Sequence, residues 1–541
     1  TLSYCEVQTA DSRQCLVSNE GSLISVVKID GVMELIGREE FEYIKNGIQQ
    51  SLQASMSKTG HSIQVYFGYD KYLVNEQIEE VFSNAKETAD RIGLNLDDLF
   101  KERVENLSNY CSYEEAFLVV WTKVSALSKD QFKNAMKDKA KAIKEDDTPP
   151  FRQTQNIIAA VSELRESHDS LVKLMVQDFK MFGIVANVLD VHEAVYTMRR
   201  IGDPDFTDRS WSAVLPGDKI TIKELKNTSG EVSDILWPSL GKQILPRDAE
   251  RLDLRTTRIG DRIYSTVFID LFPKDVQPFM RLFTRAMQSN IPWRISFNIE
   301  SKGLGFSTIR SVLASVLTFS SSQNRLISDS LKLLEYINLN TDDSVVRLRV
   351  SASTWASEDN KRLLRTRTSI LARAIEGWGS CDVSEICGDP YEGAVSTMVG
   401  VTSSNPGQAT LAPLSDVLHM LPLFRPSSPW DNGAILFRSP DGKLWPYHPG
   451  SRFQTTFIDL FYARPGSGKS VLSNAINLAV CLSSGIQRLP RIAIIDIGPS
   501  SSGLISLLKD ALPVNQKHYV AYHRLQMSAS YSINPFDTQL G

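Results

Sequence analysis

A glycine-rich loop between an apolar run and a helical pattern is the feature that most constrains the fold of this 541-residue chain. It reads Ala463-Arg464-Pro465-Gly466-Ser467-Gly468-Lys469-Ser470. The pattern is that of the phosphate-binding loop G-x-x-x-x-G-K-[ST], with alanine in place of the first glycine. Because that position mainly shapes the entry to the turn, we expect the alanine to be tolerated.

The residue types in this loop each have a chemical role. Gly466 and Gly468 permit backbone conformations closed to other residues, so that consecutive N–H groups can surround phosphate oxygens. Lys469 is expected to reach the β- and γ-phosphates as the catalytic cation, and the Ser470 hydroxyl to ligate Mg²⁺. The loop therefore predicts an ATP and Mg²⁺ site, and the alternative is a Gly-rich turn with an exposed lysine. The expected nucleotide-binding residues are Ala463, Arg464, Pro465, Gly466, Ser467, Gly468, Lys469, Ser470 and Val471.

The segments around the loop have an α/β pattern. Residues 456–462 read as a strand that enters the loop, 470–484 as the helix that leaves it, and 491–496 as a second buried strand. Asp496 closes this second apolar run and is followed by Ile-Gly-Pro-Ser rather than by glutamate. We interpret it as a loop aspartate that caps the next helix, in preference to a carboxylate that orients Mg²⁺.

The length of the chain predicts more than one domain. Strand patterns occur at 23–27, 62–67, 116–121, 262–272, 294–299 and 345–350, and helix patterns at 40–56, 75–110, 276–288 and 307–337. The sequence thus predicts an α/β protein with a mixed α+β amino-terminal docking and assembly region at 1–400, followed at 401–541 by the first part of a nucleotide-binding domain. A weak recurrence of the patterns suggests two similar halves, about 1–135 and 240–360, with a helical insert between them.

Composition disfavours several classes of function. The chain has 59 Lys plus Arg against 63 Asp plus Glu, a formal net charge of -4, which is not typical of a dedicated nucleic-acid binder. No apolar stretch is long enough to span a membrane and the amino terminus carries no secretion signal, so we expect a fragment with cytosolic character. The six cysteines are too sparse for a disulfide scaffold, and reduced thiols are expected.

Two patterns resemble metal sites by composition only. Cys381 and Cys387 have no second pair or histidine at metal spacing, which favours free thiols. Asp190, His192 and Glu193 contain suitable ligand types, but an ordinary polar patch is the favoured interpretation.

Two charged runs have equally plain explanations. Residues 137–147 alternate in charge, which favours the solvated face of a helix over a binding role. The basic patch at 361–373 lies on a predicted helix and is interpreted as solvated surface or as contact with an acidic partner, in preference to nucleic acid.

Several motifs together resemble one protein family. They are Leu421-Pro422-Leu423-Phe424-Arg425-Pro426, Trp430-Asp431-Asn432-Gly433, the phosphate loop, Asp496-Ile497-Gly498-Pro499-Ser500 and Ile533-Asn534-Pro535-Phe536-Asp537. The set is similar to the large cytoplasmic ATPases of bacterial type IV secretion and conjugation, in particular the Dot/Icm-type branch and its relatives on conjugative plasmids. The specific motifs cover 421–541, and upstream the resemblance rests on the order of elements and on the runs 263–271 and 293–300.

The resemblance implies a RecA-like motor domain after an amino-terminal domain that docks to the inner-membrane complex. It implies a hexamer or a hexamer of dimers with ATP between subunits, at the cytoplasmic face of the bacterial inner membrane. The implied partners are inner-membrane secretion components, companion secretion ATPases and, indirectly, secreted effector proteins, with nucleic acid not expected as the main ligand. The metal-orienting aspartate and the catalytic glutamate of the family are expected downstream of this chain.

Three functions are compatible with the sequence. The preferred one is an ATPase that energises assembly of, and transport through, a type IV secretion system. The others are a nucleic-acid translocase of the same RecA-like class, which would use the basic patch at 361–373, and a non-catalytic docking scaffold. We expect the 541-residue chain itself to hydrolyse ATP poorly, because the residues after Ser470 add only about two further strands to the nucleotide-binding sheet.

Overall fold

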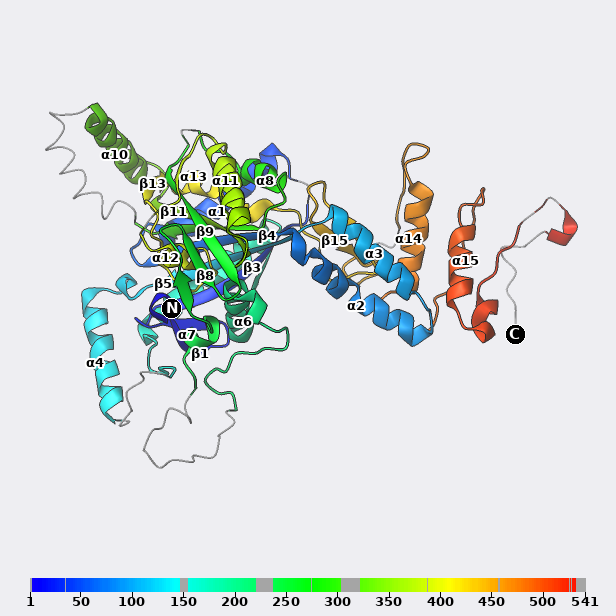
Figure 1. The fold of residues 1–541 in the computed structure, drawn as a ribbon, viewed down its shortest axis with the longest axis horizontal. Coiled ribbons are helices and arrows are strands. Elements are labelled where there is room, and N and C mark those ends of the chain that lie inside the picture. The colour runs from blue at the N-terminus through cyan, green and yellow to red at the C-terminus, as the bar shows by residue number, and fades with distance from the viewer. Residues whose placement is uncertain are drawn as a thin grey trace. The chain divides into compact units, whose positions relative to one another are not determined.

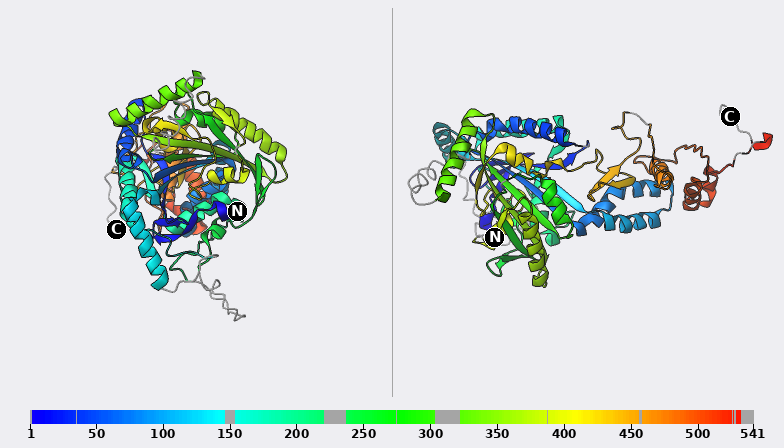
Figure 2. Two further views of the ribbon diagram at one scale, coloured as in Figure 1. Left: turned by 90° about the vertical axis from the view of Figure 1, so that its left-hand side faces the viewer. Right: turned by 90° about the horizontal axis from the view of Figure 1, so that it is seen from above.

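A computed structural model describes the chain as two compact units. The described residues are 2–34, 36–145, 154–219, 237–273, 275–302, 322–386, 388–455, 458–524, 526 and 528–531. The first unit comprises Thr1–Lys71 and Glu114–Ser427, and the second comprises Tyr72–Tyr113 and Ser428–Gly541. Figure 1 labels their elements, and Figure 2 gives two further views.

A large antiparallel sheet forms the centre of the first unit. Its strands are β1 (Val7–Ser12), β2 (Cys15–Ser18), β3 (Leu23–Val32), β4 (His61–Asp70), β5 (Tyr113–Thr122), β6 (Ile184–Val188), β7 (Ala249–Arg251), β8 (Thr256–Ile259), β9 (Arg262–Leu271), β10 (Trp293–Glu300), β11 (Val345–Ser357), β12 (Asp382–Ser384) and β13 (Thr410–Pro413). Across the described residues these 13 strands follow the path β1-β2-β3-β5-β4-β10-β11-β9-β8-β7, with β6 paired to β3, β12 to β9 and β13 to β11.

Helices cover both faces of this sheet (Figure 1). One face carries α1 (Arg38–Met56), α5 (Arg165–Met181), α8 (Phe279–Met287), α11 (Lys361–Glu376) and α13 (Leu414–His419), and the other carries α6 (Val191–Gly202), α7 (Leu240–Ile244) and α12 (Pro390–Ser396). Side chains alternate between the faces, so that Val65 and Phe67 of β4 join the first core and Tyr66 joins the second. Burial on both faces explains why these strands read as nearly continuous apolar runs.

Apart from the interrupting helices at Lys129–Glu145 and Ser322–Asn340, the main elements of the first unit follow one another in the same order twice. The first series is β1-β2-β3-α1-β4-β5-α5-β6-α6, and the second is β7-β8-β9-α8-β10-β11-α11-β12-α12. In the sheet, β4 pairs antiparallel with β10, with Tyr66 opposite Ser296. Outward from this pair come β5, β3, β2 and β1 on one side and β11, β9, β8 and β7 on the other. The strand order is therefore two-fold symmetric about the β4–β10 pair.

A buried arginine on β10 connects the two halves. Arg294, which is 2% exposed, donates hydrogen bonds to the carbonyl oxygens of Ile201 (2.8 Å) and Ala394 (3.1 Å) and to the hydroxyl of Thr397 (2.8 Å). These carbonyls lie in the last turns of α6 and α12, where the helix dipole is negative. The guanidinium thus ties equivalent helices of the two halves to the middle of the sheet.

His168 of α5 is fully buried and hydrogen-bonded at both ring nitrogens. Its Nε2 lies 2.9 Å from Ser25 Oγ, and its Nδ1 lies 2.9 Å from Thr122 Oγ1. Because the Ser25 hydroxyl donates to the carbonyl oxygen of Gln14 (2.7 Å), Nε2 must carry the proton and Nδ1 must accept from Thr122. Burial, reinforced by nearby His61, lowers the pKa of His168 to about 4.

We expect the first unit to lose stability in mild acid because of this histidine. Between pH 6.5 and about 4 the unfolded chain binds a proton that the folded chain excludes, so the free energy of unfolding falls as the pH falls. The loss amounts to roughly 3 kcal/mol at pH 4. Urea unfolding from pH 8 to 5 should therefore show a shallower acid slope for His168→Gln than for the wild type. If the free energy of unfolding of His168→Gln depends on pH as steeply as that of the wild type, the acid sensitivity belongs to other groups. The same holds if His192→Gln, at a more exposed histidine, reduces the slope as much as His168→Gln does.

Two peripheral helices complete the first unit. They are α4 (Lys129–Glu145) and α10 (Ser322–Asn340). On α4, Lys137 and Asp138 are exposed, in agreement with the solvated face predicted at 137–147, whereas Lys139 is half-buried and donates to the carbonyl oxygen of Ala159 at 2.9 Å. The side chains of 142–145 and residues 146 and 147 are not described.

The second unit contains a helical pair, a hairpin and two further helices. The pair is α2 (Val74–Ile92) and α3 (Asp97–Tyr110), the hairpin is β14 (Ile435–Arg438) with β15 (Leu444–Tyr447), and the helices are α14 (Lys469–Cys481) and α15 (Ser502–Ala511). All of them share one apolar core. Gly433 enters the hairpin where a Cβ atom would lie 2.4 Å from the carbonyl oxygen of Tyr447, so this position requires glycine. The helical pair is continuous in sequence with β4 and β5 but packs with residues more than 300 positions away.

The two strands predicted around the phosphate loop are wrong for the residues that the structure describes. Residues 458–462 and 491–496 form no strand, and Ile458, Leu460 and Ile495 are 85%, 85% and 95% exposed. Parallel strands occur almost only in sheets whose two faces are covered, and each needs at least one neighbouring strand to pair with. The described part of the second unit contains no strand that pairs with either segment, so the nucleotide-binding sheet expected at 401–541 is not formed there.

Among the described residues, none of the helices combines the length and apolar character needed to cross a membrane.

Candidate nucleotide site

The predicted phosphate loop runs directly into the first residue of α14. Gly466 and Gly468 have φ angles of +80° and +89°, in the left-handed region that favours glycine. The space around both glycines is open, so the backbone conformation and not crowding is the reason for glycine here. Both the hydroxyl and the backbone N–H of Ser467 donate to the carbonyl oxygen of Arg464, at 2.7 and 3.3 Å, which closes the turn.

Lys469 and Ser470 are the first two residues of α14, and residues 462–471 are all exposed. Gly468 precedes the helix and offers no side chain to cap it. The first N–H groups of a helix have no partner within the helix and carry partial positive charge, which makes this end suited to an anion. The loop therefore brings together glycines, a helix N-terminus, a lysine and a hydroxyl, the groups that a nucleotide phosphate with bound Mg²⁺ requires.

The rest of α14 fixes this loop to the second unit. Its buried residues, Ile476, Leu478, Ala479 and Cys481, lie in its carboxyl-terminal half and pack into the core. Its first three residues, Lys469 to Val471, are exposed, and Leu472 and Ala475 are half-buried against the same core. The helix thus presents its phosphate-binding end outward while its other end is anchored.

A second loop lies beside the start of α14. The Asn474 side chain donates to the carbonyl oxygen of Ser500 at 2.8 Å, one helical turn after Ser470. This contact holds the turn at 496–501 against the phosphate-loop helix. Sequence reasoning missed Asn474, and the available signal was an amide side chain four residues after Ser470 in a largely apolar helix.

The Asp496 carboxylate is occupied by its own turn. It accepts hydrogen bonds from the backbone N–H groups of Gly498 and Ser501, both at 3.1 Å, and from the hydroxyls of Ser500 (2.5 Å) and Ser501 (3.1 Å). These bonds, first that from Ser500, lower the pKa of Asp496 to about 2. Asp496 is therefore a loop aspartate, as predicted, but its hydrogen bonds close its own turn and none goes to an N–H group of α15 (Ser502–Ala511), so the predicted helix cap is not seen. Its partners immediately precede α15, but no described strand precedes it.

The apolar segment that enters the loop is tied to the hairpin of the second unit. The Tyr447 hydroxyl donates to Asp459 Oδ1 at 3.2 Å and accepts from the Gln454 side chain at 3.0 Å. Burial, as the largest cause, raises the pKa of Tyr447. Tyr447 thus orients the chain just before the phosphate loop.

The described residues contain no cluster of three or more metal-ligating side chains. Asp190 caps α6, where its carboxylate accepts from the Glu193 backbone N–H at 2.9 Å while Glu193 accepts from the Asp190 N–H at 3.2 Å. His192 pairs with Asp218 at 2.9 Å. The acidic pair that resembles a metal cluster in sequence is therefore a helix capping box.

The remaining weak candidates also have structural explanations. Cys381 is a buried free thiol, and burial raises its pKa to about 11, whereas Cys387 lies outside the described residues. On α11, Lys361, Arg362, Arg365 and Arg373 are exposed while Leu364 and Leu371 are buried, so these four basic residues lie on the solvated face of an amphipathic helix. Arg367 is half-buried and donates to the carbonyl oxygen of Trp355.

No protein-family model matches this chain, and no curated protein matches it.

Proposed function

We propose that this chain is part of an ATP-binding and ATP-hydrolysing motor of a bacterial type IV secretion system of the Dot/Icm type. The observation that carries the proposal is the phosphate loop: two glycines in left-handed conformation, followed at once by a helix whose first residues are Lys469 and Ser470. ATP is the proposed ligand, with Mg²⁺ held through the Ser470 hydroxyl.

The motor would be of the RecA-like class. The exposed apolar segments at 458–462 and 491–497, on either side of α14, have the composition of buried parallel strands. In the proposed assembly they pair with further strands of such a sheet. The same proposal places the protein in a hexamer, peripheral to the cytoplasmic face of the inner membrane, with the first unit contacting inner-membrane secretion components and companion ATPases.

Binding of a fluorescent ATP analogue, with Mg²⁺ present, tests the nucleotide site directly. We expect saturable binding that unlabelled ATP displaces, and Lys469→Ala should weaken it by about tenfold or more because it removes the cation that faces the phosphates. Lys517→Ala, which changes an exposed lysine elsewhere in the second unit, is the matched control. Absence of displaceable binding, or equal weakening by both variants, would favour a docking scaffold.

The competing function, nucleic-acid translocation, makes a different prediction for the same protein. A translocase would bind DNA through the exposed basic face of α11. Phosphate contacts there would give a DNA affinity that falls steeply as the salt concentration rises. We expect no such binding, since the formal net charge is -4. Tight, salt-sensitive binding of DNA that is lost on charge reversal at Arg362 and Arg365 would replace our proposal.

A further inference from the structure

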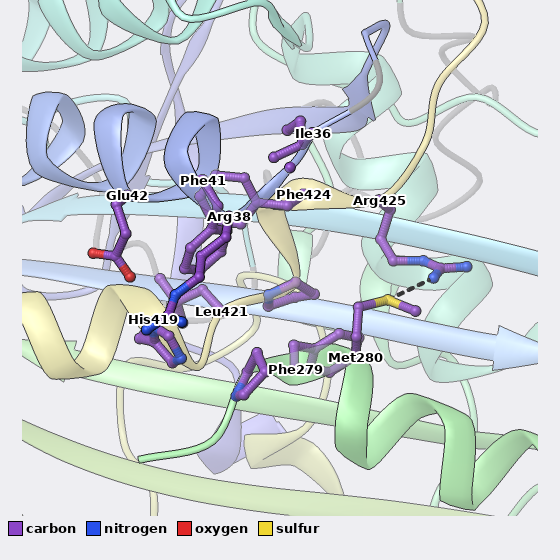
Figure 3. A pocket seen from close by; sticks show the side chains of 13 residues that line it. Ile36, Arg38, Phe41, Glu42, Phe279, Met280, His419, Leu421, Phe424 and Arg425 are labelled. Carbon is purple, nitrogen blue, oxygen red and sulfur yellow. Dashed lines mark hydrogen bonds between the residues drawn. The ribbon is translucent and has the colours of Figure 1, made fainter.

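A cavity of about 410 Å³ opens on the helix-covered face of the first unit that carries α1 and α8 (Figure 3). Three separate segments line it: the start of α1, the start of α8 and the stretch that follows α13. Its walls are largely apolar, with Phe41, Phe279, Met280, Pro422 and Phe424 among the lining residues. The volume is within the range of pockets that bind a ligand or the anchor side chain of a partner.

The walls of this pocket are held in place by the fold. Phe41 packs against Phe424, with ring centroids 4.6 Å apart, and against the His419 ring at 5.1 Å. Arg425, at the other end of the pocket in Figure 3, lies 3.9 Å above the Phe283 ring and pairs with buried Glu114. The pocket is therefore preformed, which lowers the entropic cost of filling it.

Among the charged residues that line the pocket, Arg38 is the cation with no ion pair to another described residue. Glu42 pairs with Lys45 at 2.6 Å, and Arg425 pairs with Glu114 at 2.5 Å. Burial lowers the pKa of His419, so its ring is neutral at pH 7. Arg38 is exposed and forms no ion pair with any residue that the structure describes, although its charge contributes weakly to the lowered pKa of Glu42.

The backbone adds to the positive character of the pocket. Arg38 is the first residue of α1, where the helix dipole disfavours a cation. The α8 helix also begins at the pocket, and neither helix receives a side-chain capping hydrogen bond from the residue before it. Glu39 and Glu40 follow Arg38 on α1 but do not line the pocket. An apolar cavity lined by an exposed arginine that forms no ion pair is complementary to an apolar group next to an anion.

We propose that this pocket docks a partner protein by a single large apolar side chain, leucine or phenylalanine, with a neighbouring aspartate or glutamate that pairs with Arg38. The pocket opens to solvent, and Met280 is 38% exposed there, with its Sδ accepting from Arg425 Nη1 at 3.0 Å (Figure 3). Exposed methionine is common at peptide-binding surfaces. The inference goes beyond the proposed ATPase, because it holds whether or not the second unit binds nucleotide.

Selection from a displayed library of short random peptides on the full chain tests this proposal. The enriched peptides should share leucine or phenylalanine beside an acidic residue. Their affinity should fall by about tenfold or more for Arg38→Glu and for Met280→Glu, and stay unchanged for Lys173→Glu, an exposed lysine on α5. Unchanged thermal unfolding of the variants would separate lost binding from lost folding.

A charge swap makes the same test specific. Peptides with lysine in place of the acidic residue should bind Arg38→Glu better than they bind the wild type. The proposal is overturned if the enriched peptides share no such motif, if Arg38→Glu binds them normally, or if charge exchange rescues nothing. It is also overturned if the wild type forms dimers and Met280→Glu dissociates them, because the pocket would then bind a second copy of the chain. Binding of dodecanoate alone, as tight as that of the best peptide, would likewise overturn it.

Discussion

Replacing Lys469 by alanine should abolish ATP-driven activity of the complete protein while leaving the fold intact. The lysine occupies the first position of α14 and is exposed, so its removal breaks no packing contact. In the proposed site it neutralises the γ-phosphate as negative charge shifts in the transition state, and loss of such a group costs about a hundredfold or more in rate. Steady-state phosphate release and secretion of a reporter substrate in cells are the measurements.

Two comparisons make the Lys469 result informative. Ser470→Ala should lower the rate at limiting Mg²⁺ and recover partly at high Mg²⁺, because it removes a metal ligand and not the phosphate-facing cation. Lys517→Ala should behave as wild type. If Lys469→Ala supports phosphate release and secretion at wild-type levels, the loop at 463–470 is a glycine-rich turn with an exposed lysine and the proposed function fails.

The sequence was sufficient to predict the elements that bury an apolar face. The helix expected at 40–56 is α1, and the strands expected at 62–67 and 294–299 are β4 and β10, each longer by a few residues. Periodicity of apolar residues predicts these elements because each is buried in the first unit itself. The same patterns do not identify which strands pair with one another in the sheet. The pairing of β4 with β10 therefore came only from the structure.

The candidate nucleotide site was predictable only in part, for a related reason. The loop at 463–470 is local, and its glycines require left-handed conformations that the sequence already implies. Residues 491–496 have a strand composition, but a strand also needs a neighbour, and none of the described residues supplies one. The contact of Asn474 with Ser500 depends on how the loop at 496–501 approaches α14, and the pocket beside Arg38 depends on three distant segments. Neither the contact nor the pocket can be recognised from a short stretch of sequence.

Glu114→Gln should destabilise the first unit by about 3–5 kcal/mol, because it leaves the buried Arg425 charge without its partner. The side chains of Glu114 and Arg425 are 2% and 3% exposed, and the pair is bidentate, with Nε to Oε1 at 3.0 Å and Nη2 to Oε2 at 2.5 Å. The carbonyl oxygen of Arg425 also accepts from the Val32 N–H at 2.7 Å, so the pair fixes the pocket-lining segment to the sheet. Urea unfolding and hydrogen exchange at β5 measure the loss.

A double-mutant cycle shows whether this cost belongs to the pair. Arg425→Met alone should also be strongly destabilising, since it leaves a buried carboxylate, whereas the double variant Glu114→Met with Arg425→Met should lose much less than the sum of the single losses. Glu250→Gln, in an exposed pair with Arg258, should cost at most about 1 kcal/mol. Additive losses in the cycle would mean that Glu114 and Arg425 stabilise the unit through separate contacts. In that case the pocket wall is held by the Val32 hydrogen bond and by ring packing around Phe424, and peptide binding at Arg38 should survive Glu114→Gln.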